Sequence, residues 1–127
     1  KYEKYAPSLS ARLEAANKAI LDGWNVRLCF DPIIKIENWQ VIYEAFVNYI
    51  FSVIPPNRVY DASIGTFRMP AEYLKKIKKV RFDSDLIFYP FDCQNGIARY
   101  HPAVEMELAD YMMNLVTRYM DRSHIFL

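Results

Sequence analysis

The sequence predicts a single α/β domain spanning residues 1–127, with mainly parallel strands and flanking helices, as in half of a partial (β/α) barrel. Stretches with apolar residues at helical spacing alternate with short β-rich runs, and the connectors between them are short. Each β-rich run ends in polar or conformationally restricted residues, which is typical of the ligand-binding end of a parallel sheet. A small doubly wound sheet shows the same alternation and remains an alternative.

The N-terminal half contains two helix–strand steps. Pro7 and Ser8 open the first helix, and Gly23 stands where a helix C-cap is expected. In the strand that follows, Cys29 is expected in the packed interior, where a free cysteine behaves as a small hydrophobic residue. The expected elements are a helix over 8–22, a strand over 24–34, a helix over 38–53 and a strand over 59–64.

The C-terminal half continues the alternation. Pro70 and Pro102 fit the first turns of two further helices, since proline is tolerated there. The first of these helices is expected to bury Tyr73, Leu74 and Ile77. The remaining expected elements are a strand over 85–91, a hairpin around Asn95-Gly96, the longest helix from Pro102 and a last strand over 124–127.

Composition limits the classes of function. With 53% hydrophobic and 24% charged residues and a net charge of +1, the chain is typical of globular proteins and has no overall basic footprint for nucleic acid. No apolar run approaches the roughly 20 residues of a membrane helix, so a cytoplasmic protein without membrane contact is expected. Glycine-rich phosphate-binding motifs are absent. Cys29 and Cys93 form no C-x-x-C motif, and neither histidine has a partner set for metal binding.

Three candidate site residues follow the expected strands. Asp31, Arg68 and Tyr89 stand at strand ends, and the carboxyl ends of parallel strands are where ligands bind. An arginine there is suited to grip a phosphate or carboxylate with its planar fork. The alternatives are that Asp31 caps a turn and that Arg68 forms a surface salt bridge.

Two further candidates, Arg99 and Tyr100, lie in the expected hairpin. A tight turn that presents an arginine and a tyrosine together could follow a phosphate backbone and stack on bases. The basic run over 75–81 also suggests nucleic acid, but on the outward helix of a barrel its lysines are better explained as a solvated face.

Over about residues 7–127 the chain resembles the spore photoproduct lyase family, whose members are radical-SAM enzymes that repair a thymine lesion in DNA. The resemblance rests on four blocks: Ser8 to Ala16; Phe30-Asp31-Pro32-Ile33-Ile34 with Trp39 and Tyr43; Ser63-Ile64-Gly65-Thr66-Phe67-Arg68 followed by Tyr73-Leu74-Lys75; and Gly96-Ile97-Ala98-Arg99-Tyr100. The last block corresponds to a family hairpin that wedges into damaged DNA.

The resemblance implies the C-terminal half of such an enzyme. In the family, a 5′-deoxyadenosyl radical abstracts a hydrogen atom from the lesion, and a [4Fe–4S] cluster and S-adenosylmethionine (SAM) supply that radical. The cluster motif Cys-x-x-x-Cys-x-x-Cys is absent here, as is the family's hydrogen-returning cysteine. The chain is therefore expected to hold no cofactor itself, to be a piece of a longer protein, and to provide the substrate-side wall through Asp31, Arg68, Tyr89, Arg99 and Tyr100.

The implied partners are damaged DNA and the N-terminal half of the same enzyme. A half barrel has unpaired sheet edges, so self-association through them is also expected. Two alternatives stay open: a radical-SAM relative with another substrate, and a stand-alone binding module without catalysis.

Overall fold

In the computed structural model, residues 8–79 and 89–127 are described. Their helices are α1 (Leu9–Leu21), α2 (Trp39–Val53), α3 (Ala71–Lys78) and α4 (Pro102–Val116). Their strands are β1 (Val26–Ile33), β2 (Val59–Thr66), β3 (Arg68–Pro70), β4 (Asp92–Gln94), β5 (Ile97–Arg99) and β6 (Ile125–Phe126). Short 3₁₀ turns at Pro56–Arg58 and Arg122–His124 precede β2 and β6.

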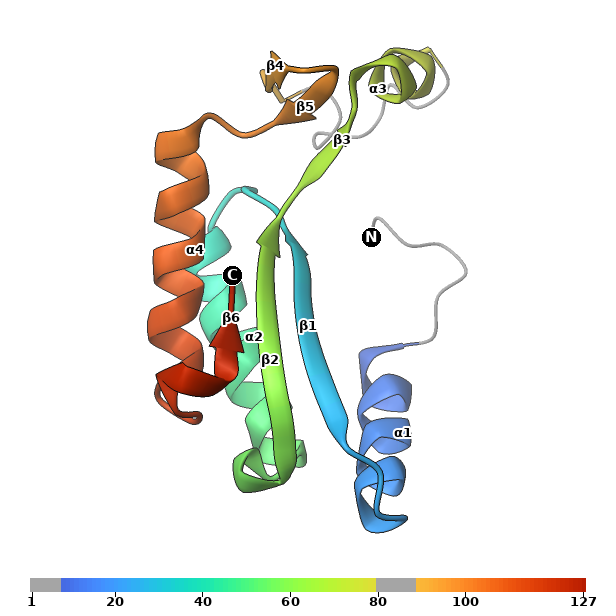
Figure 1. The fold of residues 1–127 in the computed structure, drawn as a ribbon, viewed down its shortest axis with the longest axis vertical. Coiled ribbons are helices and arrows are strands. Elements are labelled where there is room, and N and C mark those ends of the chain that lie inside the picture. Colours follow the sequence, from blue (N-terminus) through green and yellow to red (C-terminus); the bar gives the residue numbers. More distant parts are fainter. Residues whose placement is uncertain (1–7, 80–88) are drawn as a thin grey trace.

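The main sheet contains three parallel strands in the order β1-β2-β6 (Figure 1). Phe30 of β1 lies opposite Ile64 of β2, and both side chains are buried. The β1 register shifts after Phe30, where the Asp31–Pro32 peptide bond is cis. The predicted α/β class, with parallel strands and flanking helices, is confirmed.

A second, antiparallel sheet has the order β3-β5-β4, and the pairing of β3 with the β4–β5 hairpin was not predicted. The hairpin expected around Asn95-Gly96 is confirmed, and both turn residues have positive φ, of 53° and 76°. The strand expected over 85–91 falls in part on residues 85–88, which lie outside the described residues. Residues 89–91 of the same prediction form no strand.

The core lies between the parallel sheet and the pair α2 and α4. Leu108, Met112 and Leu115 are spaced at i, i+4 and i+7 along α4 and are at most 1% exposed, so one stripe of the helix faces inward. The Trp39 ring of α2 meets the Tyr111 ring of α4 edge-on, with centroids 5.0 Å apart. This packing fixes α4 against β2 and so determines the shape of the surface between them.

Local signals explain several element ends. The Ser8 hydroxyl accepts a hydrogen bond from the Ala11 amide at the start of α1, and Gly23 follows the helix with a φ of 90°. Before β6, Asp121 accepts hydrogen bonds from the amide and hydroxyl of Ser123, which lower the pKa of its carboxyl. None of the helices within residues 8–79 and 89–127 is both long and apolar enough to cross a membrane.

Two expectations about burial are wrong. Cys29 is exposed rather than interior. It alternates with Phe30 along β1 and lies opposite Ser63, on the face of the sheet turned away from the core. Tyr73 of α3 was expected to be buried but is 55% exposed; Leu74 is the buried residue of that helix.

The inward stripe of α4 gives a direct stability test. Leu108→Ala should lower the free energy of unfolding by about 2–5 kcal/mol, because it leaves a cavity in a packed core. Met106→Ala, two residues away but 65% exposed, should change it by less than about 0.5 kcal/mol. Urea denaturation monitored by circular dichroism measures both, and equal losses would contradict the packing described for α4.

Candidate functional site

A groove of about 780 Å³ opens where β1 and β2 end, between these strands and the first half of α4. Its position is the one predicted for a ligand site in a parallel sheet. The lining residues are Asp31, Ser63, Ile64, Gly65, Thr66, Arg68, Arg99, Pro102, Glu105, Met106, Ala109, Asp110 and Leu127. The lining therefore combines polar and charged side chains with the apolar Met106, Ala109 and Leu127.

The Asp31 carboxylate lies directly over the backbone of β2 at Gly65. A Cβ atom on Gly65 would lie 2.5 Å from the Asp31 Oδ2 atom and 2.7 Å from its Cγ atom, closer than two such atoms can approach. Glycine matters here through this close approach and not through its φ, which lies outside the positive range: a Cβ would force the Asp31 carboxylate to shift. Because Gly65 has no side chain, the Asp31 carboxylate can lie against the backbone of β2 within the groove.

Arg68 holds that carboxylate from β3. Its Nη1 and Nη2 atoms lie 3.4 Å from Oδ1 and 3.3 Å from Oδ2 of Asp31, as a two-pronged fork. Nη1 also donates to the Thr66 carbonyl at 3.0 Å. The bonds to Asp31 are longer than the usual 2.9 Å or so for an N–H···O bond, so a ligand could replace them at low cost.

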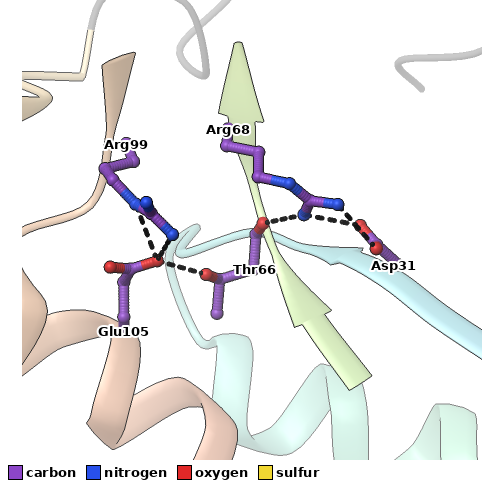
Figure 2. Close-up of polar contacts among 5 residues, drawn as sticks. All are labelled: Asp31, Thr66, Arg68, Arg99 and Glu105. Atoms are coloured by element: carbon purple, nitrogen blue, oxygen red, sulfur yellow. Dashed lines mark hydrogen bonds and ion pairs between the residues drawn. The ribbon is translucent and has the colours of Figure 1, made fainter. Parts of the chain in front are cut away.

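A second arginine–carboxylate pair lies beside the first (Figure 2). Nε and Nη2 of Arg99 lie 3.3 and 3.2 Å from the Glu105 Oε2 atom, which also accepts from the Thr66 hydroxyl at 2.9 Å. Thr66 therefore joins the two pairs, since its carbonyl binds Arg68 while its hydroxyl binds Glu105. Arg68 and Arg99 are themselves opposite each other in the β3–β5 register.

The charges of this groove nearly cancel. Two arginines and three carboxylates, those of Asp31, Glu105 and Asp110, line it, so its formal charge is −1. The side chains of Arg68 and Arg99 are 51% and 44% exposed, and ion pairs this open to solvent contribute at most about 1 kcal/mol of stability. The groove therefore offers hydrogen-bond donors and acceptors side by side, together with some apolar surface, instead of a strongly positive anion site.

The structure brings three of the five predicted site residues together. Asp31, Arg68 and Arg99 all line the groove. Tyr89 is half-buried and does not line it; its ring centroid lies 5.0 Å from that of Tyr100. Among the alternatives, the salt bridge expected for Arg68 is present, and its partner is the other candidate, Asp31.

The expectation that Tyr100 stacks on bases does not fit its position. Its side chain is 0% exposed and packs edge-on against Tyr89, with Phe91 also in contact. Its hydroxyl accepts a hydrogen bond from the Lys35 amide at 2.7 Å. Tyr100 therefore stabilises the loop after β1 from inside the core, while Arg99, one residue earlier, points to the groove.

Glu105 was not identified from the sequence, although it binds both Arg99 and Thr66. It lies in the first turn of α4, where an acidic residue is common because of the helix dipole. The sequence does contain a signal for this pair. His101-Pro102 marks a helix start, and an acidic residue in the first turn of that helix, Glu105, lies close to the strand that precedes it and contains Arg99.

The described residues do not fit an iron–sulfur cluster. No group of three or more His, Cys, Asp or Glu side chains within residues 8–79 and 89–127 is placed to hold a metal ion. Cys29 and Cys93, on β1 and β4, are the chain's two cysteines, and such a cluster takes at least three thiolates from one protein loop.

Comparison with known proteins shows similarity at the level of the fold. No family model matches the chain, and no curated protein matches it significantly. Spore photoproduct lyase with AdoMet and a dinucleoside spore photoproduct, in a doubly substituted form, superposes with a TM-score of 0.80 at 16% identity. Spore photoproduct lyase complexed with dinucleoside spore photoproduct gives 0.79 at 17%. Each match covers 96% of this chain but 38% of the other, so the chain has the fold of a segment of that enzyme.

The contact between Gly65 and Asp31 can be tested with a double-mutant cycle. Gly65→Ala should displace the Asp31 carboxylate and break its fork with Arg68, whereas in an Asp31→Ala background the same change should be nearly neutral. The expected coupling is about 0.5–1 kcal/mol in the free energy of unfolding, since the ion pair that is lost is largely exposed. Additive effects would show that the carboxylate does not rest on Gly65.

The cysteine arrangement generates a second test. After anaerobic reconstitution with iron and sulfide, the 127-residue chain should show no stoichiometric cluster in its visible spectrum or iron content. Stoichiometric incorporation that is lost in a Cys29→Ala/Cys93→Ala variant would overturn this ligand count.

Proposed function

We propose that this chain is the C-terminal, substrate-binding segment of a radical-SAM DNA-repair lyase of the spore photoproduct lyase type. The observation that supports it is the groove at the carboxyl ends of β1 and β2, in a fold that matches a segment of that enzyme. The segment spans 38% of the matched enzyme, so the proposal concerns a longer parent protein. Such an enzyme would act in the cytoplasm.

The chemistry of the groove suits a pyrimidine base. A thymine-derived ring presents carbonyl acceptors, an imide N–H donor and apolar faces. Arg68 can donate to a carbonyl and Asp31 can accept from the N–H, since their mutual bonds are long. Met106, Ala109 and Leu127 provide apolar surface in the same groove for the ring. A groove of formal charge −1 is better matched to such an uncharged, polar-edged group than to a bare phosphate.

In this proposal, the work is divided between the two halves of the parent protein. The described residues hold no metal-binding group, so the N-terminal half would carry the [4Fe–4S] cluster and most contacts to SAM. The edge strand β1 offers that half a place to pair. The residues Asp31, Arg68, Arg99 and Glu105 bind and orient the damaged base within the groove.

A relative that acts on another substrate is the second candidate. Identities of 16–17% and the absence of a matching family model favour it, because substrate choice within one fold changes with a few groove residues. A binding module without catalysis is the third candidate, and a Cys-x-x-x-Cys-x-x-Cys loop in the parent protein would exclude it.

Binding measurements on the full-length protein test the lesion assignment. Arg68→Ala should reduce the preference for a duplex containing spore photoproduct over the undamaged duplex by about tenfold or more, since it removes charged hydrogen-bond donors worth about 1.5–3 kcal/mol. Lys18→Ala, on the exposed face of α1, serves as the control and should leave the preference unchanged. Fluorescence anisotropy at matched salt measures both.

Two outcomes would contradict the proposal. A wild-type protein without preference for the lesion would favour the relative with another substrate. An Arg68→Ala variant that keeps the full preference would show that the groove is not where the lesion binds.

A further inference from the structure

Helix α3 does not belong to the layer that covers the parallel sheet. Its contacts are with β3 and β5, and it lies apart from α2 and α4, beyond the carboxyl ends of β1 and β2 (Figure 1). Leu74 packs against Ala98 in a small separate core, and the Ala71 amide donates to the Gly96 carbonyl at 2.8 Å. Most of its lysines are exposed, as the solvated-face explanation expected, but the helix packs on β3 and β5 and not on the parallel sheet.

The exposed face of α3 concentrates positive charge. Lys75, Lys76 and Lys79 are exposed at i, i+1 and i+4, and Glu72 is the acidic residue on the same face. Glu72 reaches Lys75 only at 3.9 Å, with both side chains about three-quarters or more exposed, so it neutralises little of this charge. Tyr73 stands beside the lysines with its ring half exposed.

This charge is local rather than a property of the whole chain. The sequence has 16 basic and 15 acidic residues. Residues 71–79 contain four of the basic residues and one of the acidic residues. The rest therefore carries 12 basic and 14 acidic residues and is slightly negative. A polyanion that meets this protein would be drawn to α3 before any other described helix.

The helix is also joined directly to a strand that contributes to the groove. It begins at Ala71, directly after β3, whose first residue is Arg68. Because no loop separates β3 from α3, the lysine-bearing helix follows Arg68, a groove residue, by only a few positions in the chain. A linear polyanion such as duplex DNA fits this extended arrangement better than a compact anion does.

We propose that the outer face of α3, formed by Tyr73, Lys75, Lys76 and Lys79, binds the sugar–phosphate backbone of duplex DNA next to the groove. The contact is independent of base sequence and of damage, because lysines on phosphates carry no sequence information. This inference builds on the proposed function, but it assigns a different role to a different surface: α3 supplies general affinity, and the groove supplies selection of the lesion.

The test uses the full-length protein and two duplexes, one undamaged and one containing spore photoproduct, over 50–200 mM salt. The triple variant Lys75→Gln/Lys76→Gln/Lys79→Gln should lose about tenfold or more in affinity for both duplexes. The slope of log K against log salt should become shallower by about 2–3, since each lysine that no longer neutralises a phosphate reduces it by roughly 0.9. Glu72→Gln should change both in the opposite direction, and Lys18→Gln on α1 is the matched control.

The outcomes separate this inference from the proposed function. If the protein shows no lesion preference but the triple variant still loses affinity for both duplexes, the groove assignment fails and the α3 contact stands. An unchanged salt slope in the folded triple variant, or no binding of wild-type protein to DNA at 50 mM salt, would overturn the α3 contact. Stronger binding to phosphatidylserine vesicles than to DNA, abolished in the triple variant, would also overturn it and assign the face to membranes.

Discussion

The whole arrangement depends on how the chain passes from the parallel sheet into the antiparallel one. A single residue, Phe67, separates the end of β2 from the start of β3. Its amide donates to the Ile33 carbonyl at 3.0 Å, and its buried ring lies 5.3 Å from that of Phe91. The two sheets are therefore held at a fixed orientation, and Arg68, the next residue, is placed above Asp31 at the end of β1.

Three functional features follow from this one connection. Gly65 leaves room for the Asp31 carboxylate, Thr66 joins the two ion pairs, and Arg68 forms the fork, so neighbouring positions build the polar side of the groove. The same run continues through β3 into α3 and its lysines. Since exposed ion pairs contribute little stability, the positioning comes from the buried core around Phe67, and the ion pairs are left to respond to a ligand.

The sequence predicted the parts of this fold that rest on local patterns. Apolar stripes located α2 and α4, and Asp31 and Arg68 were found because they follow buried strands. The β4–β5 hairpin was predicted from its Asn95-Gly96 turn, but its pairing with β3 was missed because β3 has three residues, too few to show a period of two. The pairing of Arg99 with Glu105 depends on how α4 packs against β2, which no local pattern reports.

The separation of Tyr100 from Arg99 has a similar physical origin. Neighbouring residues at a strand end point in opposite directions, so Arg99 reaches the groove while Tyr100 enters the core. From residue type and spacing, Arg99 and Tyr100 were expected to act together on a ligand. The packing of the Tyr100 ring on Tyr89 and Phe91 shows that the two side chains lie in different environments. The same reasoning applies to α3, whose lysines could be assigned a partner only after its contacts with β3 and β5 were known.

A crystal structure of the full-length protein with dinucleoside spore photoproduct would test the groove assignment most directly. One pyrimidine ring should lie against Met106 and Leu127, with its carbonyl and imide groups within about 3.2 Å of Arg68 and Asp31. The bonds between Arg68 and Asp31 should lengthen or break in that complex. A ligand bound elsewhere, with the fork between Arg68 and Asp31 unchanged, would contradict the assignment.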